Sequence, residues 1–467
     1  MPTGPFDKRS KRSRCSPCSS SHLKCDGASP CNQCHRRNIT CTYQMASSLI
    51  KVDQSKVKTI LHFSSKQKQA QTVPSLQVLT LSPTTTDRHL FYFDVFAQRN
   101  NFVANTVSYD FDIKTLLGTE PGQYLVYAVS ALGALQSSRL NSATSQDDSR
   151  AAMKAYASSV ATLRDAMAHS SPPSRLHVLW TTLLLGLFEL MNNESGDGWL
   201  VHMVHGTGAA LQASGPSLCM SGLGHSFFLQ ARVFEVSRAL LLGDSTFLSD
   251  PQWTALSQGL YSGAQTPGQL LNELLDIIVQ CSHLRVKTGT LIRSLDHQQL
   301  DERKDEAQAL ASEGLQLRAA LDAWRVTSLL EWHTRSPSTS PYEANLASLC
   351  NIYFAAISIF LSGVFDYEIL HWQAWGLSVP TLPEEQIQLH VQTILDLISY
   401  ALQHTTISPL LFLFSLRIVG ARSYDQKRQV QVLDLLGRIS DQFTVARIFQ
   451  MELGEVWQSR GSLTPDG

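Results

Sequence analysis

The apolar residues from about residue 87 onwards recur with the period of an α-helix. Two stretches show this most plainly, with spacings of three and four between Val391, Ile394, Leu395, Ile398 and Leu402, and between Val432, Leu436, Ile439 and Phe443. Groups of proline, glycine and serine, such as Ser171-Pro172-Pro173, separate the long helical stretches. No series of alternating strand segments lies between them. The pattern therefore predicts a mostly α protein whose residues 87–460 form a large all-α body.

A polar segment precedes this body. Residues 46–86 are rich in Ser, Thr, Lys and Gln and contain two prolines, so we expect them to form a flexible linker. The best heptad register in this segment places Ile50 and Val57 at one core position and Asp53 and Ile60 at the other, and it then runs into Ser64 and Gln67. Because a coiled coil needs a sustained apolar repeat, the sequence does not support homodimerisation through this linker.

Six of the nine cysteines lie within the first 41 residues. They form two copies of the spacing C-x2-C-x6-C, which comprise Cys15, Cys18 and Cys25, and then Cys31, Cys34 and Cys41. Two thiolates separated by two residues can bind one zinc ion, and four ligands complete its tetrahedron. Because six sulfurs must fill eight coordination positions on two ions, two sulfurs must each bind both metals. The spacing predicts a binuclear cluster with two zinc ions per chain.

Two other interpretations of these cysteines are open on the sequence alone. Disulfides would need an oxidising compartment, but the chain opens with Met1-Pro2-Thr3-Gly4 and charged residues rather than an apolar signal segment. His22 or His35 could replace a sulfur in a mixed Cys/His site, although both lie beside intact cysteine spacings. We favour the binuclear cluster because it uses all six cysteines.

The six spacings resemble those of the fungal-type zinc binuclear-cluster transcription factors. This resemblance implies that Cys15 and Cys31 bridge the two metals, with Cys18 and Cys25 completing one zinc and Cys34 and Cys41 completing the other. Passages of the helical body, such as Leu90-Phe91-Tyr92-Phe93, resemble the fungal-specific transcription factor regulatory domain. The implied organisation is a zinc-cluster DNA-binding module at 8–45, the linker at 46–86 and an all-α regulatory domain at 87–460.

The net charge of −1 hides an uneven distribution along the chain. Residues 1–45 carry a formal charge of +6, and the rest of the chain carries −7. Clustered lysines and arginines favour a polyanionic partner, because they release counterions from backbone phosphates. The stretch from Lys8 to Arg14 could serve as a nuclear import signal, as an arm that contacts phosphates, or as both. It could also be a solvated run of charge.

The segment between the second and third cysteines departs from the family pattern. In relatives a short helix here presents basic side chains to a CGG triplet in the major groove, whereas this chain has Cys18-Ser19-Ser20-Ser21-His22-Leu23-Lys24-Cys25. Ser21 and His22 occupy the positions that usually contact guanine, and a serine cannot make the bidentate contact of arginine or lysine. We expect relaxed base selection, with phosphate contacts from Lys11, Arg12, Arg14, Lys24, Arg36 and Arg37.

Other kinds of function find no support in the sequence. It contains no P-loop, no G-x-S-x-G, no dinucleotide-binding glycines and no H-E-x-x-H motif, so we expect no enzyme. His202 and His205 lack a third metal ligand, and Cys219, Cys281 and Cys350 are expected to be small buried residues. The best apolar runs are only about ten residues long, so we expect no membrane-spanning segment.

These observations predict a nuclear, zinc-dependent, sequence-specific transcription factor that binds double-stranded DNA. The family resemblance implies regulation of RNA polymerase II genes, with control of one metabolic or secondary-metabolite pathway as a common role. An alternative is a co-regulator or interaction protein whose degenerate recognition helix does not read DNA on its own. Transcriptional co-regulators are further expected partners in either case.

Overall fold

The computed structural model describes residues 31–37, 85–102, 109–119, 122–169, 173–192, 206–259, 267–295, 302–334 and 341–461. The chain divides into two compact units, Met1–Ser82 and Pro83–Gly467. Helix α2 (Asn32–Arg36) belongs to the first unit, and all other described helices belong to the second. Within the described ranges the only extended pairing is a bridge between Asn101 and Ile407, so the predicted mostly α fold class is confirmed.

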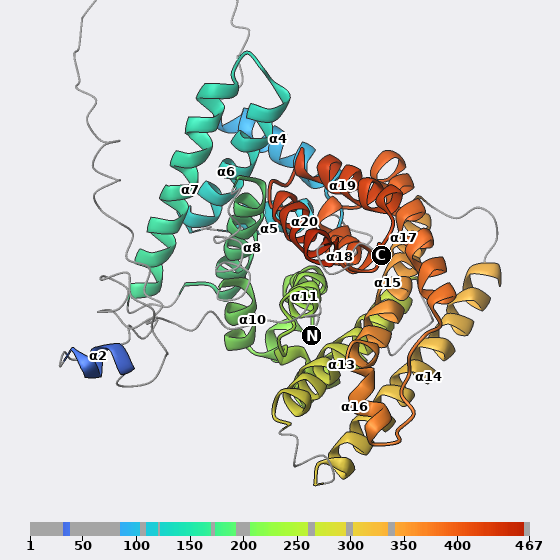
Figure 1. Cartoon of the computed structure of the whole chain (residues 1–467). Coiled ribbons are helices and arrows are strands. Elements are labelled where there is room, and N and C mark those ends of the chain that lie inside the picture. The colour runs from blue at the N-terminus through green and yellow to red at the C-terminus, as the bar shows by residue number, and fades with distance from the viewer. Residues whose placement is uncertain are drawn as a thin grey trace, which may run out of the picture. The chain divides into compact units, whose positions relative to one another are not determined.

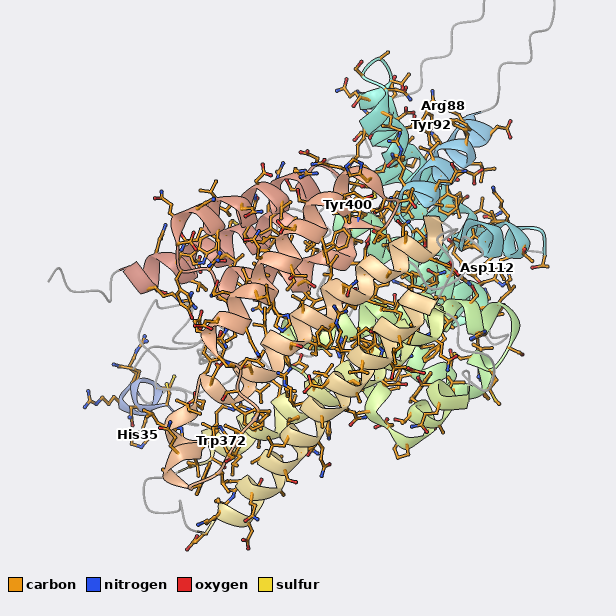
Figure 2. All side chains as sticks on the ribbon, turned by 90° about the vertical axis from the view of Figure 1, so that its right-hand side faces the viewer. His35, Arg88, Tyr92, Asp112, Trp372 and Tyr400 are labelled. Atoms are coloured by element: carbon orange, nitrogen blue, oxygen red, sulfur yellow. The ribbon has the colours of Figure 1, made fainter. Side chains whose placement is uncertain are left out.

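The second unit is called the body below. Its first described helices are α4 (Thr85–Arg99), α5 (Tyr109–Leu117), α6 (Gln123–Leu140), α7 (Ser145–Ala168) and α8 (Arg175–Asn192). Helix α6 packs against α4, α7 and α8 and is buried over most of its surface (Figure 1). Arg88 and Tyr92 lie on α4 near the start of the body (Figure 2), and the Tyr92 hydroxyl accepts a hydrogen bond from Asn141 Nδ2 at 2.6 Å. Polar contacts thus add to the apolar packing of α4 onto α6.

The middle of the body is built around a buried helix, α11 (Gly222–Leu242). Around it in the chain lie α10 (Gly208–Ser214), η2 (Pro216–Cys219), η3 (Phe247–Ser249), α12 (Pro251–Gly259) and α13 (Pro267–Arg293). Helix α11 contacts α8 and α13, and it ends at Gly243, whose φ of 62° is left-handed. Glycine adopts this conformation without the steric cost that a Cβ atom brings.

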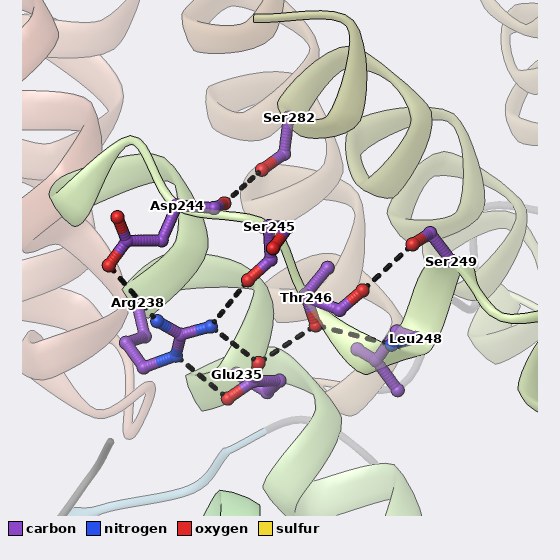
Figure 3. Close-up of polar contacts among 8 residues, drawn as sticks. All are labelled: Glu235, Arg238, Asp244, Ser245, Thr246, Leu248, Ser249 and Ser282. Atoms are coloured by element: carbon purple, nitrogen blue, oxygen red, sulfur yellow. Dashed lines mark hydrogen bonds and ion pairs between the residues drawn. The ribbon is translucent and has the colours of Figure 1, made fainter. Parts of the chain in front are cut away.

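Helix α11 also buries charge. Arg238 donates from Nε and Nη2 to the two carboxylate oxygens of Glu235 at 3.0 and 2.8 Å, and both side chains are less than 10% exposed (Figure 3). Thr246 Oγ1 donates to Glu235 at 2.8 Å, and Arg238 Nη2 donates to the carbonyl of Ser245 at 3.0 Å. The pair is therefore fully engaged, and it ties α11 to the loop that follows it.

The remaining described helices of the body are α14 (Lys304–Thr334), α15 (Pro341–Asp366), α16 (Ile369–Ala374), α17 (Glu384–His404), η4 (Pro409–Phe412), α18 (Leu413–Ala421), α19 (Gln426–Ser440) and α20 (Ala446–Gly461). Helix α15 contacts α13, α14, α17 and α18, which places it in the centre of this group. The predicted apolar stripes are confirmed on their buried side, because Val391, Ile394, Leu395 and Ile398 on α17 are 0% exposed.

The expectation that no apolar helix reaches membrane-spanning length is wrong for α15. Within the described residues, Glu343–Asp366 is long and apolar enough to cross a membrane by length and composition alone. However, 83% of its most apolar window is buried inside the body. A core helix that is covered on every side by other helices has the same all-round apolar character, so this finding is weak evidence for a membrane span.

Candidate zinc and DNA-binding site

The described part of the cysteine-rich segment is the short helix α2, with Cys31 directly before it and Cys34 in its first turn. Cys31 is the N-cap of α2 and has an extended backbone, with φ −70° and ψ 153°. Its sulfur accepts a hydrogen bond from the backbone N–H of Cys34 at 3.4 Å. An N-cap side chain normally accepts from an N–H of the first helical turn, and here a cysteine sulfur takes that place. The C-x2-C spacing thus fixes both cysteines on the same helical turn.

The same two cysteines are hidden from solvent. Cys31 and Cys34 are both 0% exposed, although the helix that carries them has only five residues. Two cysteine sulfurs held at the start of one turn are the donors that zinc prefers, and the amide hydrogen bond to Cys31 Sγ would support the sulfur as a negatively charged ligand. The chemistry of this pair therefore fits a zinc site.

The opposite side of α2 is polar and exposed. His35, Arg36 and Arg37 all lie in solvent at the end of the helix. Because His35 is exposed while the two sulfurs are buried, its ring lies on a different side of the turn from the cysteine pair. This placement favours sulfur ligands over a mixed Cys/His site, and it leaves the two guanidinium groups available to an external anion.

The structure therefore tests only part of the predicted site. It brings together Cys31 and Cys34, and it places Arg36 and Arg37 on the exposed side of the same helix. The remaining predicted residues lie outside the described ranges: Cys15, Cys18, Cys25, Cys41, Lys11, Arg12, Arg14, Ser21, His22 and Lys24. No group of three or more His, Cys, Asp or Glu side chains placed to hold a metal is found within the described ranges.

One feature of the site was missed at the level of sequence, namely the role of Cys31 as a helix cap. The signal was present, because an N-cap side chain reaches an N–H three residues ahead and the C-x2-C spacing supplies that separation. His202 and His205, considered as a second metal pair, also lie outside the described ranges.

The three cysteines of the body are buried, as expected. Cys219, Cys281 and Cys350 are each at most 1% exposed. Burial raises the pKa of Cys219 to about 11 and the pKa of Cys281 to about 12, and it raises the pKa of Cys350 as well. These thiols are therefore protonated near neutral pH and behave as small apolar residues.

Comparison with known proteins decides the family. Residues 14–49 match the fungal Zn(2)-Cys(6) binuclear cluster domain, and residues 78–465 match the fungal specific transcription factor domain. The chain belongs to the fungal specific transcription factor family. Its Zn(2)-Cys(6) domain is of a kind that binds zinc, and the domain implies DNA binding.

A curated relative matches a smaller part of the chain. This relative is uncharacterized protein AN5342 of Emericella nidulans, which is 33% identical over 81 residues. The match covers 17% of this chain and 17% of the relative, so it extends over only a small part of either protein. No solved structure matches the chain.

Proposed function

We propose that this member of the family is a zinc-dependent, sequence-specific DNA-binding transcription factor that acts in the nucleus on RNA polymerase II genes. Control of one metabolic pathway, such as the synthesis of a secondary metabolite, is the proposed biological role. The observation that carries the proposal is the buried Cys31–Cys34 pair on α2, within a segment whose six cysteines have the spacing of the zinc-cluster domain.

In this proposal all six N-terminal cysteines hold two zinc ions. Cys15 and Cys31 would bridge the ions, Cys18 and Cys25 would complete one, and Cys34 and Cys41 would complete the other. Few apolar residues lie between these cysteines, so metal coordination would supply most of the folding energy of the module. The proposed limits are 8–45 for the module, 46–86 for the linker and 87–460 for the regulatory domain.

DNA binding would depend mainly on positive charge. Arg36 and Arg37 are exposed beside the cysteine pair, where they can contact backbone phosphates. Lys11, Arg12, Arg14 and Lys24 would add further phosphate contacts. Ser21 and His22 would face the bases, and their short or neutral side chains would give a relaxed preference compared with arginine or lysine at the same positions.

The test uses the full chain with selection from random-sequence DNA and measurement of zinc content. We expect two zinc equivalents per chain and an affinity that falls steeply between about 50 and about 200 mM salt. Replacing Arg36 and Arg37 together by glutamine should lower the slope of log affinity against log salt by about 2, because each lost phosphate contact removes about 0.9. Arg150→Gln is the matched control and should leave the slope unchanged, because Arg150 is an exposed arginine of the body that pairs with the exposed Asp147.

A second function is favoured by the recognition segment itself. Residues 19–23 contain no lysine or arginine, so the module could have lost its ability to read DNA alone and could serve as a co-regulator. In that case the full chain would still bind two zinc ions but would enrich no sequence from random DNA. Zinc content of one equivalent or none would instead overturn the binuclear cluster.

A further inference from the structure

Two arginines of α14 lie partly buried without a carboxylate partner among the described residues. Arg318 donates from Nη2 to the main-chain carbonyl of Ser358 at 2.9 Å, and Arg325 donates from Nη1 to the side-chain oxygen of Asn351. Neither guanidinium forms an ion pair with any acidic group in the part of the chain that the structure describes. The two residues are seven positions apart, which places them two turns apart on the same side of the helix.

A third basic group approaches the same place from α17. The ring of Phe354 on α15 lies 5.9 Å from the ring of His390, in an edge-on arrangement, and 5.1 Å from Cζ of Arg325. Trp324 stacks on Phe354 at 5.8 Å and is fixed by a hydrogen bond from its indole N–H to the carbonyl of Leu270 at 2.9 Å. The ring of Phe354 thus lies against both Arg325 of α14 and His390 of α17.

The electrostatics of this cluster are unfavourable as it stands. Burial lowers the pKa of Arg318, Arg325 and His390, and the positive charges of Arg318 and Arg325 lower the pKa of His390 further. The negative charge of Asp322 raises the pKa of Arg318 and so opposes the effect of burial. The Asp322 carboxylate nevertheless forms no ion pair with Arg318 in the described part of the chain. Half-buried positive charges of this kind are stabilised by a counter-charge.

Four other buried or partly buried arginines of the body are neutralised by a carboxylate that contacts the guanidinium. They are Arg232 with Asp276, Arg238 with Glu235, Arg417 with Glu452 and Arg422 with Asp366. Arg139, which has no such partner in the described ranges, donates to two main-chain carbonyls, those of Met191 and Gln442. Arg318 and Arg325 differ from these four, because within the described residues each donates to one neutral acceptor and the charges of both act on His390.

Two further polar atoms in this region have no partner within the part of the chain that the structure describes. Arg318 Nε and the hydroxyl of Ser358 are buried and make no hydrogen bond within the described residues, and Ser358 is 0% exposed. A buried donor without a partner is costly, and it is commonly satisfied by water, an ion or a ligand. Both atoms belong to the two residues that are joined by the hydrogen bond from Arg318 Nη2 to the Ser358 carbonyl, so the missing hydrogen bonds lie beside the charge of Arg318.

We propose that Arg318, Arg325 and His390 form a binding site for an oxyanion, supplied as the carboxylate or phosphate group of a small molecule. The arginines would donate charge-assisted hydrogen bonds to the anion, and His390 would donate a further one from its ring. All three residues are partly exposed, so solvent reaches each of them. A bound anion would link α14 to α17 across α15, and the site is independent of zinc and DNA binding.

The test is a thermal unfolding experiment on the zinc-loaded full chain. Inorganic phosphate and benzoate are titrated in separate arms, with ionic strength matched by sodium chloride. A ligand that binds the folded protein raises the unfolding midpoint, and we expect a rise of about 2 °C or more with at least one of the two anions. The arm that responds identifies the oxyanion class.

Variants separate this site from the N-terminal arginines. Arg325→Gln and His390→Gln should each abolish most of the rise, and Arg150→Gln, which removes one exposed positive charge elsewhere on the body, should retain it. If Arg325→Gln does not fold, His390→Gln alone decides. An equal rise in all four proteins would show a general effect of the anion, and no rise in the wild type with either anion would equally overturn the proposal.

Discussion

Gly133 of α6 lies directly against the main-chain carbonyl of His89 on α4. A Cβ atom added to Gly133 would lie 1.9 Å from the carbonyl oxygen of His89 and 2.7 Å from its carbonyl carbon. These are backbone atoms, so no side-chain rotation can relieve the contact. The absence of a Cβ atom at residue 133 is therefore what allows α4, the first helix of the body, to pack so closely on α6.

The first prediction concerns this helix crossing. Gly133→Ala should destabilise the body by about 3 kcal/mol, because overpacking at a rigid contact typically costs about 1–3 kcal/mol and sometimes more. The measurement is urea-induced unfolding of the full chain, followed by the circular dichroism of its helices.

Gly454→Ala on α20 is the matched control. A Cβ atom at Gly454 would meet no heavy atom within 4 Å, and alanine is the better helix former by about 0.5–1 kcal/mol. The control should therefore be neutral or more stable than the wild type. A Gly133→Ala protein as stable as the control would contradict the close approach of α4 and α6.

The second prediction concerns the buried pair of α11 in Figure 3. Burial alone would lower the pKa of Arg238, but the hydrogen bonds and charge of Glu235, with the charge of Asp244, outweigh it and raise the pKa. Glu235→Gln would leave Arg238 buried without its closest counter-charge, and breaking such a pair typically costs about 3–5 kcal/mol. Urea unfolding should show a loss of that order.

The exposed pair Asp147–Arg150 supplies the comparison. Both side chains are more than half exposed, and the nitrogen–oxygen distance between them is 3.1 Å. Asp147→Asn should change stability by less than about 1 kcal/mol, because water screens an exposed ion pair. An equal change in the free energy of unfolding for Glu235→Gln and Asp147→Asn would mean that burial does not strengthen the Glu235–Arg238 pair.

Features set by local spacing were predictable from the sequence. The stripe that begins at Val391 is buried on α17, and the C-x2-C pair of Cys31 and Cys34 shares one turn. Both depend on residues three or four positions apart, which the helix geometry brings together. The core of α15 was harder to interpret, because a helix that is buried on all sides has no polar face to reveal its period.

Contacts between distant segments could not be predicted. Arg417 donates to the carbonyl of Leu241 at 3.0 Å, across 176 positions of the chain. Arg318, Arg325 and His390 likewise come from helices whose packing the apolar pattern does not specify. A single sequence shows which side of each helix is apolar, but it does not show which helices meet, so the oxyanion site was not foreseen.

The third prediction concerns acidification. Burial lowers the pKa of His89, His225 and His390 below the ordinary value of 6.5, with positive neighbours contributing at His89 and His390. The unfolded chain therefore binds protons at these histidines at a higher pH than the folded chain does. Stability should be fully present above about pH 7 and should fall as the pH drops through about 6.5 toward the lowered values.

The measurement is the urea midpoint of the full chain between about pH 7.5 and about pH 5.5. His225→Gln removes one of the three groups, and it should reduce the loss of stability on acidification without abolishing it. A midpoint that stays constant or rises as the pH falls through this window would contradict the prediction.

The fourth prediction distinguishes the two groups of cysteines by their reaction with a maleimide near neutral pH. Cys219 and Cys281 are buried and have a pKa of about 11 and about 12, so the reactive thiolate is at most about one part in ten thousand at pH 7. If zinc holds the six N-terminal cysteines, the native protein should take up no label, and a zinc chelator should release six sites. Denaturant should then expose all nine cysteines of the chain. Peptide mass spectrometry locates the labels. Modification of Cys31 or Cys34 before the chelator is added would argue against metal coordination. Modification of Cys281 before denaturation would argue against the packing of α13 in the body.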